Sequence, residues 1–419
     1  MRKLLGLFMV ISLLLAGSIG AYAEQITLHM WGHSNAFFEQ ANRDIIAAYE
    51  ALNPNVKIIY ETFPYDTFLQ KSLTSFSVGE QPDILEMSGR LIMSYAKNGL
   101  VEPVPAELMT TEEMEEAFFE GAIGGYKHNG VYYAMPRESN FEYGGILANM
   151  EILRSVGVET LPTTWDELIE AAKKATIKRG NLISRHGFYL GGGDATVYYL
   201  LAFILQNGGE YWNEDQTAVN FTTPEAKKAL QEIVNLTAAH QVMARETTAP
   251  TDIFVQQRAA MVAIGSWAIS FVKSEYPELE IAYFPTPSVT DADPNYASQS
   301  GWGLVVSKDT PHQDVAWDFV KFATSTEQAR HFLKTTMNIP PNKALMSDPE
   351  LLEVNPYLEV PFKMMPYGRP LGDLRNAQQF VRIIMDAVDA AALGQISIDQ
   401  ALQNIEAEIN QMIAEADGR

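Results

Sequence analysis

The chain has 419 residues, 47% of them hydrophobic, a formal net charge of −22 and no cysteine. The lack of cysteine excludes disulfides, thiolate metal sites and a lipid-modified N-terminal cysteine, and the acidic charge disfavours nucleic acid and anionic membranes as partners. A chain this long and this apolar exceeds a single hydrophobic core, so we expect two lobes.

The first 23 residues have the pattern of an export signal. Arg2 and Lys3 form a charged start, residues 4–15 form an apolar segment, and Ala21-Tyr22-Ala23 is a small-residue cleavage site. The apolar segment is short for a membrane span, which disfavours a retained anchor. We therefore expect a periplasmic protein that is cleaved after Ala23 and carries no lipid anchor.

Strands and helices alternate in the first part of the chain. The patterns predict a strand at 25–30, a helix at 35–52, a strand at 56–60, a turn at 63–66, a helix at 67–78, a strand within 79–87 and a helix that begins at 88–90. Strand, helix and strand in this order predict a βαβ unit with a right-handed crossover. Ligands of open α/β sheets lie beyond the carboxyl ends of the strands.

The rest of the chain repeats this alternation. The patterns predict a hairpin at 126–134, strands at 144–148, 187–190 and 304–307, helices at 194–207, 224–240 and 377–393, a helical pair at 311–334 and a loop at 361–375. Thr164 and Glu167 form a predicted capping box, and Asp194 is the predicted N-cap of its helix.

Residues 254–267 contain the most informative stretch. An uncharged apolar run, Ala259 to Ile264, follows a polar helix end and stops at Gly265-Ser266. A run this short and apolar predicts a strand covered on both faces, as in a parallel sheet. Trp267 follows at once, so it stands either at the mouth of a crevice or in the core as a cap on the sheet.

This stretch resembles the pattern Phe-x-x-Gly-Lys-Ala-Ala-Met-x-x-x-Gly-x-Trp of the extracellular solute-binding proteins of family 1, the maltose-binding-protein-like receptors of ABC importers for sugars. Gln257 and Arg258 replace the usual Gly-Lys, with one extra residue after Phe254. The resemblance continues in order along nearly the whole chain after the leader, in Gly79–Asp83, Pro162–Glu167, Ala316–Phe322 and Gly394–Leu402.

The resemblance implies a periplasmic-binding-protein-like α/β fold, with two lobes and a ligand cleft between them. The chain is expected to cross between the lobes at three places, 136–140, 300–303 and 338–342. The expected parts are a signal peptide at 1–23, a first lobe at 24–137 plus 302–338 and a second lobe at 138–301 plus 339–419. The implied function is capture of a carbohydrate, a mono- or oligosaccharide, and its delivery to the transmembrane subunits of an ABC permease. A monomer is expected, without enzymatic activity, cofactor or nucleic-acid partner.

Aromatic and polar residues at strand ends, turns and crossings are the candidate ligand contacts, because sugar rings stack on aromatic faces and hydrogen-bond along their rims. The candidates are Trp31, His33, Ser34, Tyr65, Ser88, Arg90, Glu138, Asn140, Asp194, Trp267, Gly301, Trp302, Arg369 and Arg375. Each tryptophan could instead belong to the core.

Other chemistries have weaker support. His29 and His33 are about 13 Å apart along a strand, which is too far for one metal. Glu138 and Glu142 could form the carboxyl pair of a glycosidase, although neither has an assigned acid or base role.

The adjacent tyrosines at 132–133 and 198–199 could bind ferric iron. The first pair lies on a predicted strand, where neighbouring residues point to opposite faces, and the second pair lies in a predicted helix. Gly191-Gly192-Gly193 lacks nucleotide-binding spacing. A polyol, a glycerophosphodiester or ferric iron remains an alternative ligand, and an extracytoplasmic glycosidase remains an alternative function.

Overall fold

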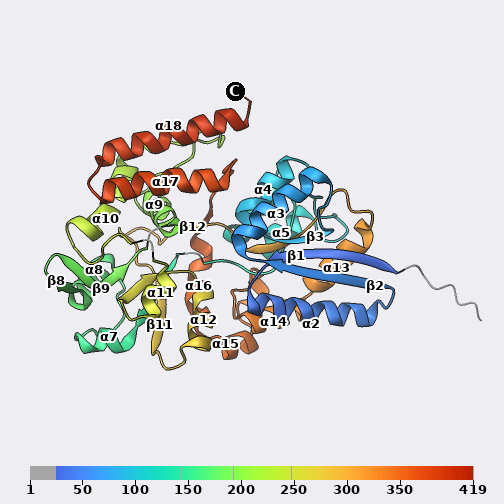
Figure 1. Ribbon diagram of the computed structural model, residues 1–419, viewed down its shortest axis with the longest axis horizontal. Coiled ribbons are helices and arrows are strands. Elements are labelled where there is room, and N and C mark those ends of the chain that lie inside the picture. The colour runs from blue at the N-terminus through green and yellow to red at the C-terminus, as the bar shows by residue number, and fades with distance from the viewer. Residues whose placement is uncertain (1–24, 142, 192, 247, 419) are drawn as a thin grey trace, which may run out of the picture.

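The computed structural model describes residues 25–141, 143–191, 193–246 and 248–418. Two five-stranded sheets, each covered by helices, lie one after the other along the long axis of the molecule (Figure 1). The predicted signal peptide and Glu142 lie outside the described residues. None of the described helices combines the length and apolarity that a bilayer crossing requires.

The first sheet is built mainly from the N-terminal part of the chain. Its order is β2 (Val56–Phe63), β1 (Ile26–His33), β3 (Ile84–Ser88), β13 (Trp302–Val306) and β6 (Met135–Pro136). Strands β1, β2 and β3 are parallel, and β13 runs antiparallel to β3 and β6. The associated helices are α2 (Ala36–Leu52), α3 (Tyr65–Val78), α4 (Gly89–Lys97), α13 (Gln313–Ala323) and α14 (Thr326–Thr336). The predicted βαβ unit is therefore present.

The second sheet has the order β11 (Ile281–Pro285), β7 (Gly145–Asn149), β10 (Ala259–Ala263), β9 (Leu182–Tyr189) and β8 (Ile177–Arg179). All five residues of β10 are buried, as the apolar run predicts. The sheet is mixed rather than parallel, because β10 pairs in parallel with β9 but antiparallel with β7.

Helices surround the second sheet, in colours that run from green through yellow to red in Figure 1. They are α7 (Met150–Ser155), α8 (Trp165–Ala175), α9 (Asp194–Gln206), α10 (Pro224–Ala238), α11 (Pro250–Val255), α12 (Trp267–Glu275), α17 (Ala377–Ala392) and α18 (Ile398–Ala416). The predicted capping box of Thr164 and Glu167 starts α8. The C-terminal helices α17 and α18 pack on α9 and α10, so the end of the chain returns to this lobe.

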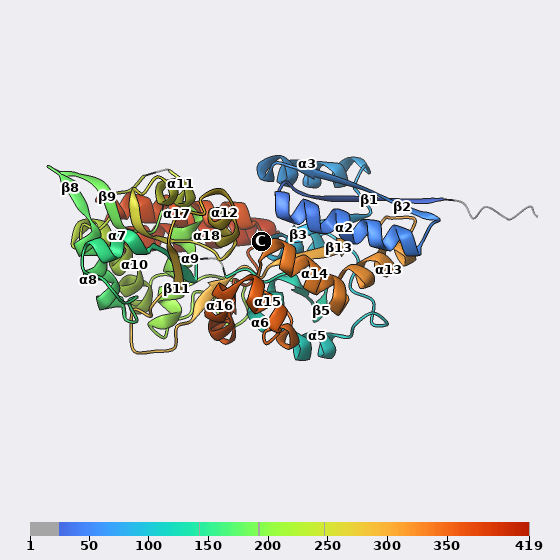
Figure 2. The ribbon, with the colours of Figure 1, turned by 90° about the horizontal axis from the view of Figure 1, so that it is seen from below.

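Short elements lie at the junction between the sheets and beside the first sheet, and several are labelled in the view from below in Figure 2. They are α5 (Thr111–Ala117), α6 (Glu120–Ile123), β4 (Lys127–His128), β5 (Val131–Tyr132), β12 (Tyr296–Ser298), α15 (Pro349–Val354), α16 (Glu359–Met364) and β14 (Gly368–Pro370). Strands β4 and β5 are the predicted hairpin. Strands β12 and β14 form a separate parallel pair.

The chain passes between the two sheets at three places, as the fold requires. The first lies between β6 and β7, the second between β12 and β13, and the third follows α14. Gly301 packs so closely there that a Cβ would lie 1.9 Å from the carbonyl oxygen of Glu138. Ser300 beside it has a φ of 64°, so the second crossing is a tight, left-handed turn.

Three local predictions were wrong. The segment at 361–375 is not a loop throughout, because α16 and β14 occupy part of it and bury Met364 and Met365. Helix α3 begins at Tyr65, directly after Pro64, rather than at 67. Asp194 is the first residue of α9 and Gly193, at a φ of 96°, is the N-cap, because only glycine readily adopts that conformation.

Candidate functional site

A cavity of about 420 Å³ lies where the two lobes meet. Ten of the sequence-predicted residues line it: His33, Ser34, Tyr65, Ser88, Arg90, Glu138, Asn140, Asp194, Trp267 and Trp302. They come from the carboxyl ends of β1 and β3, the starts of α3, α4, α9 and α12, and the first two crossings. Both lobes therefore contribute walls to one cavity, as ligand sites of open α/β sheets do.

Four predicted residues lie elsewhere. The Trp31 side chain is buried at 7% exposure, where Lys71 lies over its ring and its Nε1 donates a hydrogen bond to Glu61. Gly301 shapes the crossing but does not line the cavity, and Arg369 is exposed on β14. Arg375 forms ion pairs with Asp373 and Asp417. None of these four residues therefore lines the cavity.

The remaining lining residues were missed by sequence reasoning. They are Asn35, Phe37, Phe38, Tyr143, Ser266, Ser270, Gln299, Thr336 and Asn338. Most are neutral hydroxyl or amide side chains that belong to no motif. Ser266 directly precedes Trp267, and Asn35, the N-cap of α2, directly follows Ser34. Proximity in sequence to these predicted contacts could have found both residues.

Two tryptophans, one from each lobe, provide the large flat surfaces of the cavity. Trp302 at the start of β13 stacks on the His33 ring, with centroids 4.0 Å apart and planes 21° apart. Trp267 at the start of α12 is 39% exposed. It lines the cavity and is not a core cap on the sheet.

His33 is a neutral group of the cavity wall. Its Nδ1 is buried and has no hydrogen-bond partner among the described residues. Burial lowers the pKa of His33 to about 4, because the charged imidazolium is poorly solvated there. An uncharged imidazole packed on an indole offers the ligand a polar edge rather than a positive charge.

Arg90 of α4 is the cationic side chain among the described lining residues. It donates a hydrogen bond to the Tyr65 hydroxyl at 2.5 Å and lies 3.6 Å from a carboxylate oxygen of Asp194 in the other lobe. Burial by itself lowers the pKa of Arg90, but Tyr198, Tyr65 and Asp194 outweigh it and raise the pKa above its usual value. The guanidinium therefore stays charged and bridges the lobes.

Asp194 is held in place from its own lobe. The Tyr143 hydroxyl donates a 2.8 Å hydrogen bond to it. Arg245 donates to the carbonyl of Gly191, at the end of the strand, and to the hydroxyl of Thr196 in the first turn of α9. Hydrogen bonds from Tyr143 and Arg245 thus stabilise the turn that carries Asp194.

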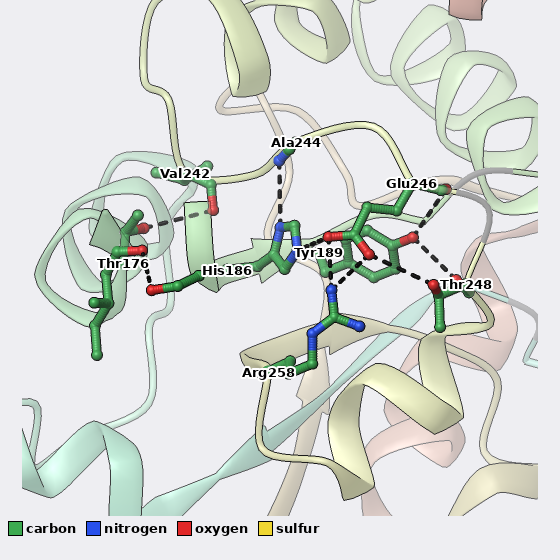
Figure 3. Close-up of polar contacts among 10 residues, drawn as sticks. Thr176, His186, Tyr189, Val242, Ala244, Glu246, Thr248 and Arg258 are labelled. Carbon is green, nitrogen blue, oxygen red and sulfur yellow. Dashed lines mark hydrogen bonds and ion pairs between the residues drawn. The ribbon is translucent and has the colours of Figure 1, made fainter. Parts of the chain in front are cut away.

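Arg245 depends on the cluster in Figure 3, where His186 and Arg258 converge on Glu246. The His186 Nδ1 accepts a hydrogen bond from the amide of Ala244, so its Nε2 donates to Glu246 at 2.8 Å. Arg258 donates to the same carboxylate at 2.7 and 2.9 Å. This histidine and carboxylate do not line the cavity and instead anchor the segment that carries Arg245.

Glu138 is the described member of the predicted carboxyl pair. Its side chain is buried, and its Oε1 accepts a 2.7 Å hydrogen bond from the amide of Trp302. This contact joins the first crossing to the second. Its predicted partner Glu142 lies outside the described residues.

Among the described residues, no group of three or more histidine and carboxylate side chains could hold a metal ion. The Tyr198 and Tyr199 hydroxyls have different partners, Gln299 and Thr286. The cavity thus combines aromatic faces, neutral polar groups, two carboxyl groups and one paired cation. Such a site suits an uncharged molecule with apolar faces and many hydroxyl groups.

Residues 33–330 match the model of the bacterial extracellular solute-binding protein family. The chain is 24% identical over 316 residues to a maltotriose-binding protein of Pyrococcus abyssi, covering 74% of this chain and 66% of the relative. It is 24% identical over 344 residues to the diacetylchitobiose-binding protein DasA of Streptomyces coelicolor, covering 80% of this chain and 77% of the relative.

Solved structures agree with the fold. The sugar-binding protein MalE of Xanthomonas citri matches 94% of this chain and 98% of its own, with a TM-score of 0.80 and 18% identity. An ABC transporter solute-binding protein of Thermotoga lettingae, bound to α-D-tagatose, matches 93% of this chain and 100% of its own, with a TM-score of 0.79 and 20% identity. These matches confirm the periplasmic-binding-protein fold.

Proposed function

Because the chain belongs to the bacterial extracellular solute-binding protein family, whose members are non-enzymatic receptors, we propose that it captures a mono- or oligosaccharide for an ABC importer. The carbohydrate binds in the cavity between the lobes. The loaded receptor then delivers it to the transmembrane subunits of the permease.

The pairing of Trp267 and Trp302 carries the proposal. They line one cavity from opposite lobes, among hydroxyl and amide side chains. Sugar rings have apolar CH faces that stack on aromatic rings and hydroxyl rims that hydrogen-bond to serine, asparagine and glutamine. The distant relatives named for maltotriose and diacetylchitobiose support the same ligand class.

The proposed mechanism is closure of two lobes around the ligand. The lobes comprise residues 24–137 with 302–338 and residues 138–301 with 339–419. A sugar that touches both tryptophans favours the closed state by its differential affinity for that state. We further propose a monomeric periplasmic protein whose signal peptide is removed after Ala23.

A thermal-shift screen tests the ligand class. The panel contains maltotriose, arabinotriose, diacetylchitobiose, a polyol, a glycerophosphodiester and ferric citrate. A true ligand at 100 times its dissociation constant adds about 2.7 kcal/mol of stability, which raises the melting temperature clearly. Stabilisation by the glycerophosphodiester, the polyol or iron alone would replace the carbohydrate proposal.

X-ray scattering tests the mechanism. The radius of gyration should fall when the stabilising sugar is added and should not fall with an inert sugar of equal size. Tight binding without compaction would contradict closure. Hydrolysis of an aryl glycoside, lost in Glu138→Gln, would instead indicate a glycosidase.

A further inference from the structure

The contact between Arg90 and Asp194 joins the two lobes inside the proposed ligand cavity. The Arg90 Nη1 and Asp194 Oδ2 atoms are 3.6 Å apart, and the Arg90 side chain is only 14% exposed. Arg90 belongs to α4 of the first lobe, and Asp194 begins α9 of the second. The positive charge of the cavity is therefore matched by a protein carboxylate before any ligand binds.

Asp194 occupies the position that an anionic ligand group would need. Around its carboxylate lie the Arg90 guanidinium, the Tyr143 hydroxyl and the first turn of the 13-residue helix α9. A cation, a hydroxyl donor and the positive end of a helix together favour an anion. The protein fills this position with its own side chain.

An anionic ligand cannot displace this carboxylate cheaply. Tyr143, at a φ of 53°, holds one carboxylate oxygen, and the contacts of Arg245 with Gly191 and Thr196 hold the turn behind it. A ligand phosphate or carboxylate would therefore lie beside Asp194. Two negative charges held side by side repel each other, which weakens the binding of an anionic ligand.

We propose that Asp194 sets the charge specificity of the cleft: its pairing with Arg90 reserves the cavity for uncharged ligands and rejects sugar phosphates and uronic acids. This inference rests on the proposed function of carbohydrate capture. It specifies that the bound carbohydrate is uncharged, and it assigns the rejection of charged sugars to Asp194.

The test compares wild type with Asp194→Asn, which keeps the shape and hydrogen-bonding capacity of the side chain but removes its charge. The neutral probe is the sugar that stabilises the wild type most in the thermal-shift screen, and the anionic probes are digalacturonate and glucose 6-phosphate. We expect the ratio of neutral to anionic affinity, measured by calorimetry, to shift about tenfold or more toward the anions in Asp194→Asn.

Asp166→Asn is the matched control. Asp166 is an exposed carboxylate in the first turn of α8 in the same lobe, and it does not line the cavity. The control makes the same change in net charge, so it should leave the affinity ratio unchanged. An equal shift in both variants would overturn the proposal, because the effect would then arise from overall charge.

A second measurement needs no sugar. Inorganic sulfate, compared with chloride at equal ionic strength, should raise the melting temperature of Asp194→Asn more than that of wild type or Asp166→Asn, because the freed Arg90 site accepts the ion. Asp194→Ser provides a second variant if Asp194→Asn folds poorly.

The outcomes separate the two proposals. If wild type binds none of the sugars, the carbohydrate function fails, and the sulfate response still reports on Asp194. A different result would overturn only the role of Asp194. In that case wild type binds a neutral sugar, and both Asp194 variants keep its preference for neutral sugars and show no additional response to sulfate. Preference of wild type for an anionic probe would also overturn it.

Discussion

The His33 imidazole lies nearly parallel to the Trp302 indole, with ring centroids 4.0 Å apart. This stack joins the end of β1 to the start of β13 and forms one wall of the cavity. Burial lowers the pKa of His33 to about 4, so the stacked imidazole is uncharged at neutral pH. Acid should therefore weaken both the fold and the wall that it supports.

The pH dependence of stability has a defined sign. The pKa of His33 is lower in the folded state than its ordinary value of 6.5, so the unfolded chain binds more protons between these values and stability falls as pH drops from about 6.5 to 4. The loss attributable to His33 is about 3 kcal/mol. In denaturant titrations at several pH values, His33→Gln should lose this pH-dependent part of the free energy of unfolding. His331→Gln, on the surface, should keep it. An unchanged pH profile in His33→Gln would contradict the assignment.

Trp267→Ala should weaken sugar binding and leave folding nearly intact. Trp267 is 39% exposed in the cavity, so its loss removes ligand stacking rather than core packing. We expect a loss on the order of 2 kcal/mol of binding energy, about thirtyfold in affinity. Calorimetry and thermal denaturation measure the two quantities separately.

Trp31→Ala is the control for that substitution. Trp31 is 7% exposed and packs edge-on against Phe63, so its truncation should cost about 3–5 kcal/mol of stability. Trp267→Ala should thus lose affinity and keep its stability, whereas Trp31→Ala should lose stability. A normal affinity and a collapsed melting temperature in Trp267→Ala would remove that residue from the proposed site.

Gly301→Ala should disrupt the second crossing. The added Cβ would lie 1.9 Å from the carbonyl oxygen of Glu138, which is main chain and cannot rotate away. We expect a loss of about 3 kcal/mol or more of stability and weaker sugar binding, because Glu138 and Trp302 flank the contact. Thermal denaturation with calorimetry checks both, and a melting temperature equal to that of wild type would contradict the close packing.

Arg137→Met should destabilise the first lobe. Arg137 and Glu86 are both buried, and Asn42 bridges them with hydrogen bonds of 2.9 Å to each. Burial raises the pKa of Glu86 and Arg137 opposes that rise, so removal of the cation leaves a buried carboxyl group uncompensated. We expect a loss of about 3–5 kcal/mol.

A double-mutant cycle checks the origin of that loss. Adding Glu86→Gln to Arg137→Met should restore part of the stability, because the remaining group is then neutral. Chemical denaturation of wild type, both single variants and the double variant gives the coupling energy. Strictly additive effects would mean that the two groups do not compensate each other.

The sequence by itself determined the features that depend on neighbouring residues. The Thr164 and Glu167 capping box, the turn between β4 and β5 and the buried run of β10 were all predicted correctly, because hydrogen bonds and periodicity within a few residues decide them. Ordered motifs along the chain also led to the family and hence to the two-lobed fold.

The tertiary structure decided which side chains meet in the cavity. Trp31 and Trp267 both have strand patterns before them, yet Trp31 lies within β1 and is buried beside Phe63, whereas Trp267 begins α12 beyond the end of β10 and lines the cavity. Arg90 and Asp194 lie far apart in sequence and on different lobes, so their contact depends on how the lobes pack. Local patterns contain no information about that packing, which also brings Tyr143 and Gln299 to the cavity without a motif.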